Sequence, residues 1–354
     1  MHERSRILKL KDILWQHKIK SVIIAILILG LGPYALSRML APLNRITTHT
    51  IHTIESKPTR EPDGKSPNTD SETDTFNFRI VAYNVAHGRG AIDDNSKEGG
   101  EAKRKRVEQI AKFLKELDAD VVVLNEVDFC STWSGHQNQA EAIARSAGYK
   151  YQVQQRNLDF RFIYGSWQFG NAILSKYPLT HSQPINYPPE KHWEDWLVGC
   201  KRGVVCEVSL DSTSVRVAAV HLEHRSESVR LGSAKLLCDL AKQTGPPLII
   251  AGDFNSAPTG FPQSTKTKDG QNTIDWIIET KLFQHRPNSI PTPEQYTFSS
   301  YSPTSVIDWI MIPSTPSAND DQARGSTFVD YKSIHSELSD HRPVIANIKI
   351  PITN

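Results

Sequence analysis

Apolar and polar positions divide the chain into a short apolar segment, a polar segment and a long mixed segment. The mixed segment begins at Phe76 and contains no internal repeat. Apolar residues three and four positions apart predict a helix over 102–117, with Val107, Ile110 and Leu114 on one face. The same patterns predict helices at 137–148 and 226–243, and strands at 78–85, 119–127, 150–156, 170–175, 203–209, 214–221, 248–251, 305–313 and 342–350.

The connections between these elements indicate how the strands pair. A turn rather than a helix separates 203–209 from 214–221, and 170–175 from the residues after it, which predicts antiparallel pairs. Helices between other strands would cover the outer faces of the sheets. The pattern therefore predicts an α/β fold in which two packed sheets are flanked by helices.

The amino-terminal segment is apolar over residues 21–36 and extends toward Leu43 if Arg38 snorkels. This length approaches the roughly 20 residues that span a bilayer. Basic residues concentrate before it, so we expect residues 1–20 to form a cytoplasmic tail and residues 21–43 a transmembrane anchor. The rest of the chain would be exported, to the periplasm or the extracellular space. The alternative is a signal peptide cleaved near "YALS", which would give a secreted protein.

Residues 44–75 are rich in Thr, Ser, Pro, Asp and Lys, which predicts a disordered linker before a folded domain at 76–354. Residues 1–75 carry 11 Lys and Arg against 8 Asp and Glu, whereas the rest of the chain carries 30 against 31. A near-neutral domain does not indicate strong non-specific binding of nucleic acid. The four cysteines lack zinc-site spacing, and Cys200 and Cys206 are either free thiols or a disulfide in an oxidising compartment.

Polar residues stand at strand ends, or inside strands, where apolar residues are expected. Asp308 is the clearest case, because it interrupts "VIDWIMI" and a buried carboxylate needs a partner. So many polar residues in one domain predict strand ends that converge on an acidic pocket containing histidine. The set consists of Asn84, His87, Asn125, Glu126, Asp128, His221, His224, Asp253, Asn255, Asp308, Asp340 and His341.

Oxygen ligands and imidazoles without a nearby thiolate favour a hard divalent cation, Mg²⁺ or Mn²⁺, over structural zinc. Mg²⁺ held by one or two carboxylates and several waters is typical of phosphate-ester chemistry. We therefore expect a metal-dependent reaction at a phosphate group.

Six motifs in order resemble the endonuclease/exonuclease/phosphatase superfamily, which includes deoxyribonuclease I, exonuclease III, neutral sphingomyelinases and inositol polyphosphate 5-phosphatases. They are "YNVAHG", "VLNEVD", "FGNAILSKYPL", "VHLEH", "GDFNS" and "SDHRPV", between about residues 78 and 350. The resemblance implies a four-layer α/β sandwich of two mixed sheets packed face to face with helices outside. It makes 76–354 the catalytic domain.

The resemblance also implies roles for individual residues. Glu126 and Asp340 match the family's metal-binding acids. Asp253 and Asn255 match the pair that positions the attacking water and holds the phosphate. His341 matches the histidine that contacts the scissile phosphate. The other implied catalytic residues are Asn84, which supports metal and phosphate, His221, which stabilises the phosphate or protonates the leaving oxygen, and Asp308, which orients His341.

One position departs from the family pattern. The exonuclease III branch often carries an aspartate two residues after the first asparagine, and this chain has Ala86 there. We therefore expect one metal ion rather than two. The expected reaction is in-line attack of water on a phosphodiester, with Asp253 orienting or deprotonating the water and Mg²⁺ offsetting developing charge.

Substrate choice is the least determined part. The insert at 186–203 carries Trp193, Trp196 and the basic pair Lys201-Arg202, and is either a substrate- or membrane-contacting loop or a structural loop. Nuclease-like chemistry on nucleic acid is the first hypothesis. A sphingomyelinase-like phospholipid phosphodiesterase or a phosphoinositide phosphatase is the second, a non-catalytic binding module is the third, and no protein partner is predicted. The residues assigned to substrate binding are His87, Arg89, Asn171, Trp193 and Arg202.

Overall fold

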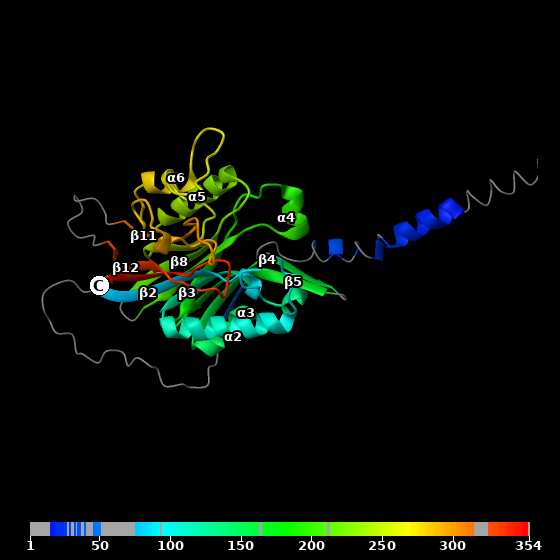
Figure 1. Cartoon of the computed structure of the whole chain (residues 1–354), viewed down its shortest axis with the longest axis horizontal. Helices are drawn as coiled ribbons and strands as arrows, with labels where there is room; N and C mark the ends of the chain where they lie inside the picture. Colours follow the sequence, from blue (N-terminus) through cyan, green and yellow to red (C-terminus); the bar gives the residue numbers. More distant parts are fainter. Residues whose placement is uncertain are drawn as a thin grey trace, which may run out of the picture.

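Two β-sheets lie face to face in the computed structural model of the chain, with helices on both outer sides (Figure 1). Both sheets are mixed, because β2 and β3 pair in parallel in one, β8 and β9 pair in parallel in the other, and the remaining pairs are antiparallel. This arrangement confirms the predicted fold of two packed mixed sheets flanked by helices. The structure describes residues 15–26, 28–29, 32, 34–36, 39, 45–50, 75–92, 94–162, 165–210, 213–314 and 325–352.

The first sheet has seven strands and the second has six. The first runs in the order β1 (Arg45–Thr50), β4 (Tyr151–Phe162), β5 (Gly165–Ser175), β3 (Val121–Asp128), β2 (Thr75–Asn84), β13 (Val344–Pro351) and β12 (Thr327–Ser333). The second runs in the order β10 (Phe283–Gln284), β11 (Asp308–Pro313), β9 (Leu248–Asp253), β8 (Ser214–His221), β7 (Gly203–Ser209) and β6 (Leu179–Ile185).

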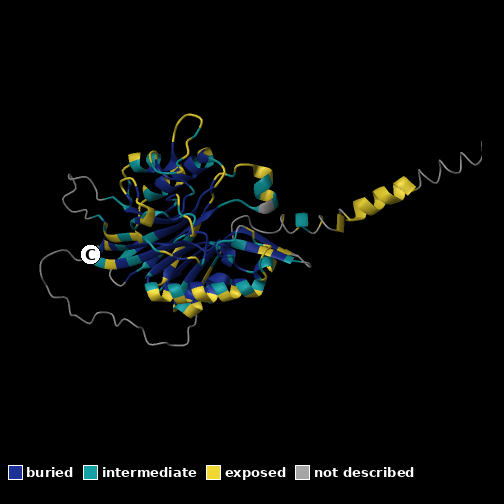
Figure 2. Cartoon of the chain, viewed as in Figure 1, coloured by how far each residue is buried: buried dark blue, intermediate teal, exposed yellow. Residues whose placement is uncertain are grey.

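The helices form the two outer layers. Helices α2 (Gly100–Leu117) and α3 (Gln139–Ala147) cover the first sheet, and α5 (Glu227–Ala241) and α6 (Thr273–Glu279) cover the second (Figure 1). Their inner faces are buried and their outer faces are exposed (Figure 2). The structure also contains a short helix, α4 (His192–Val198), and three 3₁₀ turns, η1 (Ala86–Gly88), η2 (Thr132–Ser134) and η3 (Pro293–Gln295). Residues 15–26, before the two sheets, are helical as well.

Helix ends follow local sequence signals. The Asn138 side chain accepts a hydrogen bond from the Glu141 amide at the start of α3, and Ser226 accepts one from the Val229 amide at the start of α5. Gly148 ends α3 in a left-handed conformation, with φ at 91°. These signals fix the boundaries of two helices that the apolar spacing predicted.

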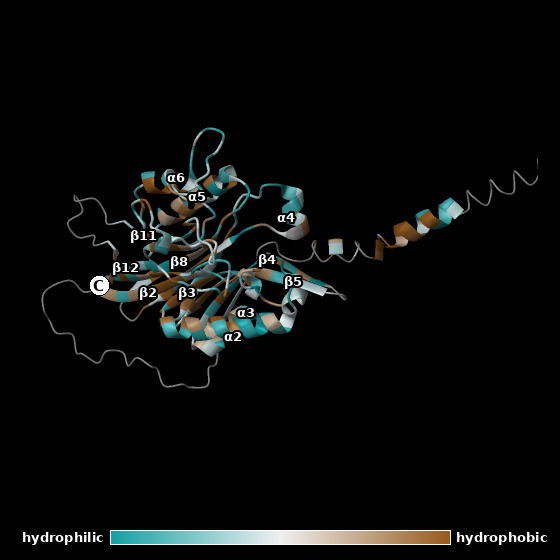
Figure 3. Cartoon of the chain, in the orientation of Figure 1, coloured by the Kyte–Doolittle hydropathy of each residue, from teal (hydrophilic) through white to brown (hydrophobic). Residues whose placement is uncertain are grey.

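Alternation along the strands distributes side chains between an inter-sheet core and an outer core. In β2, Ile80 and Ala82 face the opposite sheet, whereas Val81 and Tyr83 face α2. In β9, Ile249 joins the inter-sheet core and its neighbours join the core beneath α5 and α6. Strands buried on both faces read as apolar runs, and the central strands are accordingly hydrophobic over most of their length (Figure 3).

Several predictions about elements are wrong. Strand β5 pairs with β4 and β3, and the chain after it crosses to the second sheet as β6, so the antiparallel pairing expected between 170–175 and the next segment does not form. Residues 45–50 were assigned to the linker 44–75, yet they form β1 and pair with β4, because β-branched Ile and Thr suit an edge strand. Residues 51–74 lie outside the described part of the chain.

The predicted membrane anchor at 21–43 finds no support in the structure. Among the described residues, no helix is long and apolar enough to cross a bilayer. Part of the predicted segment lies outside the described residues. Export of the catalytic domain stays a prediction. All four cysteines are free thiols in the structure, including Cys200 and Cys206.

Candidate active site

The inter-sheet core changes from apolar to polar at one end, and this end forms the candidate site. Asn84 continues the inter-sheet face of Ile80 and Ala82, and His221 and Asp253 continue the same face of β8 and β9. Strand β11 runs antiparallel to β9, so its first residue, Asp308, pairs directly with Asp253. The fold thereby gathers residues distant in sequence, as the polar strand ends predicted.

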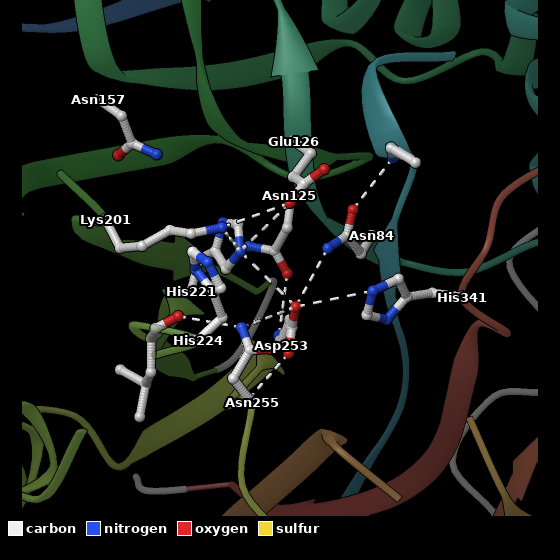
Figure 4. Close-up of polar contacts among 12 residues, drawn as sticks. Asn84, Asn125, Glu126, Asn157, Lys201, His221, His224, Asp253, Asn255 and His341 are labelled. Carbon is white, nitrogen blue, oxygen red and sulfur yellow. Dashed lines mark hydrogen bonds and ion pairs between the residues drawn. The ribbon is translucent and has the colours of Figure 1, made fainter. Parts of the chain in front are cut away.

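Asp253 lies at the centre of this cluster (Figure 4). Asn84 Nδ2 donates to its Oδ2 at 3.1 Å, and the backbone and side-chain amides of Asn255 donate to its two oxygens at 2.8 and 3.2 Å. Burial raises the pKa of the Asp253 carboxyl to about 6; Asp308 adds to this shift, although His341 opposes it. Such a carboxyl ionises close to neutral pH, which suits a general base.

Asp308 and His341 form a buried pair beside Asp253. Nδ1 of His341 lies 3.1 and 2.9 Å from the two Asp308 oxygens, and its Nε2 lies 3.8 Å from Asp253 Oδ2. Burial alone would lower the pKa of His341, but the charges of Asp308 and Asp253 outweigh it and raise the pKa to about 10. His341 is therefore an imidazolium at neutral pH, held in one orientation by Asp308.

Glu126 reaches the site through a β-bulge in β3. The pairing of β3 with β5 shifts register between Leu124 and Val127, and Glu126 has a φ of 52°. Without this bulge, alternation would direct Glu126 toward the helix side, with its neighbours Val122 and Leu124. The bulge instead turns the carboxylate into the pocket.

Glu126 is surrounded by nitrogen atoms. Lys201 Nζ lies 3.3 Å from its Oε1 and Arg89 Nη1 lies 3.2 Å from its Oε2, while His87 Nε2 and His221 Nε2 approach to 3.6 and 3.7 Å. Burial raises the pKa of the Glu126 carboxyl, but these groups, Lys201 foremost, hold it well below its ordinary value. Glu126 is thus a permanent carboxylate.

Lys201 is a functional candidate that the sequence indicated only as part of the basic pair in the insert. Its ammonium group contacts both Glu126 and Nε2 of His221 (Figure 4). Burial lowers the pKa of His221 well below its ordinary value, and Lys201 lowers it further, so His221 is a neutral imidazole that accepts from Lys201. Of the pair Lys201-Arg202, only Arg202 was assigned to substrate, because the local sequence does not indicate which of the two side chains faces the site.

His87 and Arg89 lie on the turn after β2. Nδ1 of His87 lies 2.8 Å from Asp128 Oδ1, which leaves Nε2 toward Glu126. Arg89 Nη2 donates to Asp340 Oδ2 at 2.7 Å. Both residues, assigned to substrate from sequence, therefore contact the carboxylates of the site directly.

Three other residues assigned to substrate lie away from the pocket. Asn171 is fully buried and donates to Gln155 and to the Arg202 carbonyl. Arg202 is also buried and forms an ion pair of 2.6 Å with Asp195 of α4. Trp193 projects from α4 with 63% of its surface exposed. Their roles in substrate binding stay predictions, and their positions outside the pocket do not favour such roles.

A pocket of about 220 Å³ opens beside Glu126. Phe169 and Asn157 line it from the first sheet, and the insert 186–203 contributes a wall through Glu194 and Gly199. The insert therefore borders the pocket, which is the position required of a substrate-contacting loop. The full lining consists of His87, Glu126, Asn157, Phe169, Glu194, Gly199, Cys200, Lys201, His221, Glu223, His224 and Arg225.

Two groups of residues are candidates for a divalent metal. Asp253, Asp308 and His341 offer ligand atoms within 4.8 Å of one another, but the His341 imidazolium already lies between the two carboxylates. Glu126 and Asp340 both contact one cation, the guanidinium of Arg89. Carboxylate oxygens are the ligands that hard divalent cations prefer, so Glu126 and Asp340 form the second candidate.

Comparison with known proteins agrees with the fold. Residues 81–341 match the Endonuclease/Exonuclease/phosphatase family. This match spans most of the chain, and the chain belongs to that family.

Individual relatives are distant. The uncharacterized protein YbhP of Escherichia coli K12 is 24% identical over 193 residues, which cover 52% of this chain and 69% of that protein. An inositol phosphosphingolipids phospholipase C of Schizosaccharomyces pombe is 28% identical over 203 residues, which cover 52% of this chain and 44% of that enzyme.

Solved structures share the fold at low sequence identity. An endonuclease/exonuclease/phosphatase from Beutenbergia cavernae superposes with a TM-score of 0.56 at 18% identity, over 78% of this chain and 72% of that one. ANGEL2, a 2′,3′-cyclic phosphatase, superposes with a TM-score of 0.53 at 19% identity, over 78% of this chain and 96% of that one.

Proposed function

We propose that this chain is a divalent-metal-dependent phosphodiesterase that hydrolyses its substrate by in-line attack of water. The observation that carries the proposal is Asp253, a buried carboxylate with a pKa of about 6 beside an imidazolium and two asparagine side chains. Membership of a family of phosphoester hydrolases supports the same reaction class.

Glu126 and Asp340 would hold the metal, Mg²⁺ or Mn²⁺. When bound, such an ion polarises a phosphoryl oxygen and offsets the charge that develops on it. Glu126 supplies no proton, because it is a permanent carboxylate.

The remaining residues divide the other tasks. Asp253 accepts a proton from water, and Asn84 and Asn255 hold its oxygens in place. His341, kept charged by Asp308, donates to a phosphoryl oxygen. His221 accepts from Lys201, so this pair places a positive charge near the leaving oxygen.

Two substrate classes carry a phosphodiester of this kind. Nucleic acid is the first, in line with nuclease-type chemistry. A phospholipid headgroup is the second, and the similarity to the Schizosaccharomyces pombe phospholipase C favours it. The pocket of about 220 Å³ accommodates a phosphate with a few neighbouring atoms, so the rest of either substrate would lie outside it.

The test uses the full chain, because β1 belongs to the first sheet. Plasmid DNA, sphingomyelin and a phosphoinositide are incubated in parallel with Mg²⁺ and with EDTA. Plasmid nicking alone supports a nuclease, release of a phosphorylated headgroup supports a phospholipase, and inorganic phosphate released from the phosphoinositide supports the monoesterase alternative. No turnover of any of them would favour the non-catalytic binding module.

Asp253→Asn identifies the base. We expect turnover to fall by about 10³-fold, within the usual contribution of a general base, while the circular dichroism spectrum stays unchanged. Asn255→Asp would not serve as a control because it adds a charge beside Asp253. Asn347→Ala, on β13 and bonded to Arg79, is the matched variant outside the site and should retain activity. Full activity of Asp253→Asn, or full activity in excess EDTA, would refute the mechanism.

A further inference from the structure

Arg89 lies between the two carboxylates that are assigned to the metal. Its Nη2 donates to Asp340 Oδ2 at 2.7 Å, and its Nη1 donates to Glu126 Oε2 at 3.2 Å. Its Nε donates to the Ile92 carbonyl at 2.7 Å, and only 14% of the side chain is exposed. Because each of the three guanidinium nitrogen atoms donates a hydrogen bond, the group is held in one orientation.

The backbone fixes Arg89 in this position. The turn before it contains His87 and Gly88 in left-handed conformations, with φ at 55° and 71°. Immediately after it, Gly90 forms a parallel bridge with Ser339, the residue that precedes Asp340. A Cβ at Gly90 would lie 2.8 Å from Arg106 Nε, so the loop is closely packed there. The bridge thus holds the turn that carries Arg89 next to the segment that carries Asp340.

We propose that Arg89 is an internal cation that competes with the divalent metal for Glu126 and Asp340 and lowers the affinity of the site for it. Both oxygens of Glu126 already have a positively charged neighbour, Arg89 on one and Lys201 on the other. A guanidinium stays charged at every working pH, so it does not leave by losing its proton. A metal that binds both carboxylates must displace the guanidinium or share them with it.

This competition has a physical rationale. Two carboxylates in a partly buried site repel each other and cost free energy when the site is empty. The guanidinium offsets this repulsion before the metal binds. Metal binding therefore releases less free energy than it would at two unpaired carboxylates. The inference rests on the proposed function only in assuming that Glu126 and Asp340 take a divalent ion.

The experiment measures Mn²⁺ binding without substrate, by electron paramagnetic resonance of free Mn²⁺ during titration of the full chain. Arg89→Met keeps the length of the side chain and removes its charge and its hydrogen bonds. We expect it to bind Mn²⁺ at least about tenfold more tightly than the parent, equivalent to about 1.4 kcal/mol.

The matched control is Arg225→Met. Arg225 lines the same pocket but pairs with Glu190, Glu194 and Glu223. The substitution removes the same charge from the rim, and we expect a change of about threefold or less because exposed charges are screened. An equal effect of both variants would overturn direct competition in favour of general electrostatics.

A second variant allows the test to be made even if Arg89→Met does not fold. Arg89→Lys retains the charge and loses one of the two contacts, so its affinity should fall between those of the parent and Arg89→Met. It carries the test if thermal unfolding shows that Arg89→Met is not folded. Unchanged or weaker Mn²⁺ binding in the folded variant overturns the inference.

The same data separate this inference from the proposed function. Hydrolysis of phosphodiesters with equal Mn²⁺ affinity in parent and Arg89→Met overturns the inference and leaves the function standing. Tighter binding by Arg89→Met, in a protein that hydrolyses none of the substrates, supports the inference and overturns the function. Absence of Mn²⁺ binding in both proteins overturns both.

Discussion

At the scale of single residues, the site depends on two groups whose pKa values lie far from their ordinary ones. Burial raises the pKa of Asp253 to about 6, and Asp308 and Asp253 raise the pKa of His341 to about 10 against the effect of burial. Between these values, Asp253 is ionised and His341 is protonated, which is the state that the proposed reaction requires. The same carboxylates that charge the histidine thus also set the working pH range.

The first prediction is a bell-shaped dependence of kcat/KM on pH. Activity should rise as Asp253 loses its proton near pH 6 and fall as His341 loses its proton near pH 10. Asp308→Asn removes the strongest support for the imidazolium, so the alkaline limb should move to lower pH. Initial rates across this pH range measure both limbs, and an alkaline limb that Asp308→Asn leaves in place would contradict the assignment of His341.

The second prediction concerns Lys201. Its ammonium group contacts Glu126 and His221, so Lys201→Met removes a positive charge from the place where negative charge would develop. We expect kcat/KM to fall by about 100-fold, as on loss of one preorganised donor. Lys242→Met is the control, because Lys242 pairs with Asp239 on the exposed side of α5. Comparable rates for Lys201→Met and the parent would remove Lys201 from the site.

At the scale of elements, α4 forms a wall of the pocket that is held by two arginines. Arg202 pairs with Asp195, and Arg225 pairs with Glu194. The Arg202 pair is buried, with 4% of the arginine and 14% of the aspartate side chain exposed, whereas Arg225 is 42% exposed. The buried pair should therefore contribute most to keeping α4 and the adjacent Lys201 in position.

The third prediction tests this difference. Arg202→Met leaves Asp195 without its partner in a buried position, and we expect the free energy of unfolding to fall by about 3 kcal/mol. Arg145→Met breaks an exposed pair with Glu141 on α3, and we expect a change of about 0.5 kcal/mol or less. Urea denaturation of the three proteins measures both values. Equal losses would show that burial of the Arg202 pair does not determine its contribution.

Sequence patterns predicted the parts of the site that depend on strands alone. Asn84, His221 and Asp253 interrupt apolar alternation at strand ends, and the fold places all three on the inter-sheet face. Lys201 gave no such signal, because it stands outside any strand and its direction is set by contacts between elements. The bulge at Glu126 and the strand at 45–50 could not be predicted from the sequence either, since both depend on a partner strand distant in sequence.

At the scale of the whole molecule, the two sheets meet directly beneath the site through Asn125. Its Nδ2 donates to the Val220 carbonyl of the second sheet at 3.0 Å, and its Oδ1 accepts from the Asp253 amide at 3.0 Å. At Gly252, whose φ is 136°, a Cβ would lie 2.0 Å from the Val220 carbonyl oxygen. The backbone is therefore closely packed here, and Asn125 links the position of Asp253 to the first sheet.

The last prediction is that Asn125→Ala affects stability and catalysis together. The substitution removes the hydrogen bonds that Asn125 makes to the Asp253 amide and the Val220 carbonyl in a buried region, where the loss of a partner costs about 1–3 kcal/mol. We expect the free energy of unfolding to fall by about 3 kcal/mol and kcat to fall more than KM rises, because Asp253 loses its fixed position. Asn347→Ala removes a partly buried hydrogen bond to Arg79 within the first sheet, so it should cost less and leave kcat unchanged. A loss of stability without a loss of kcat would show that Asn125 joins the sheets but does not position Asp253.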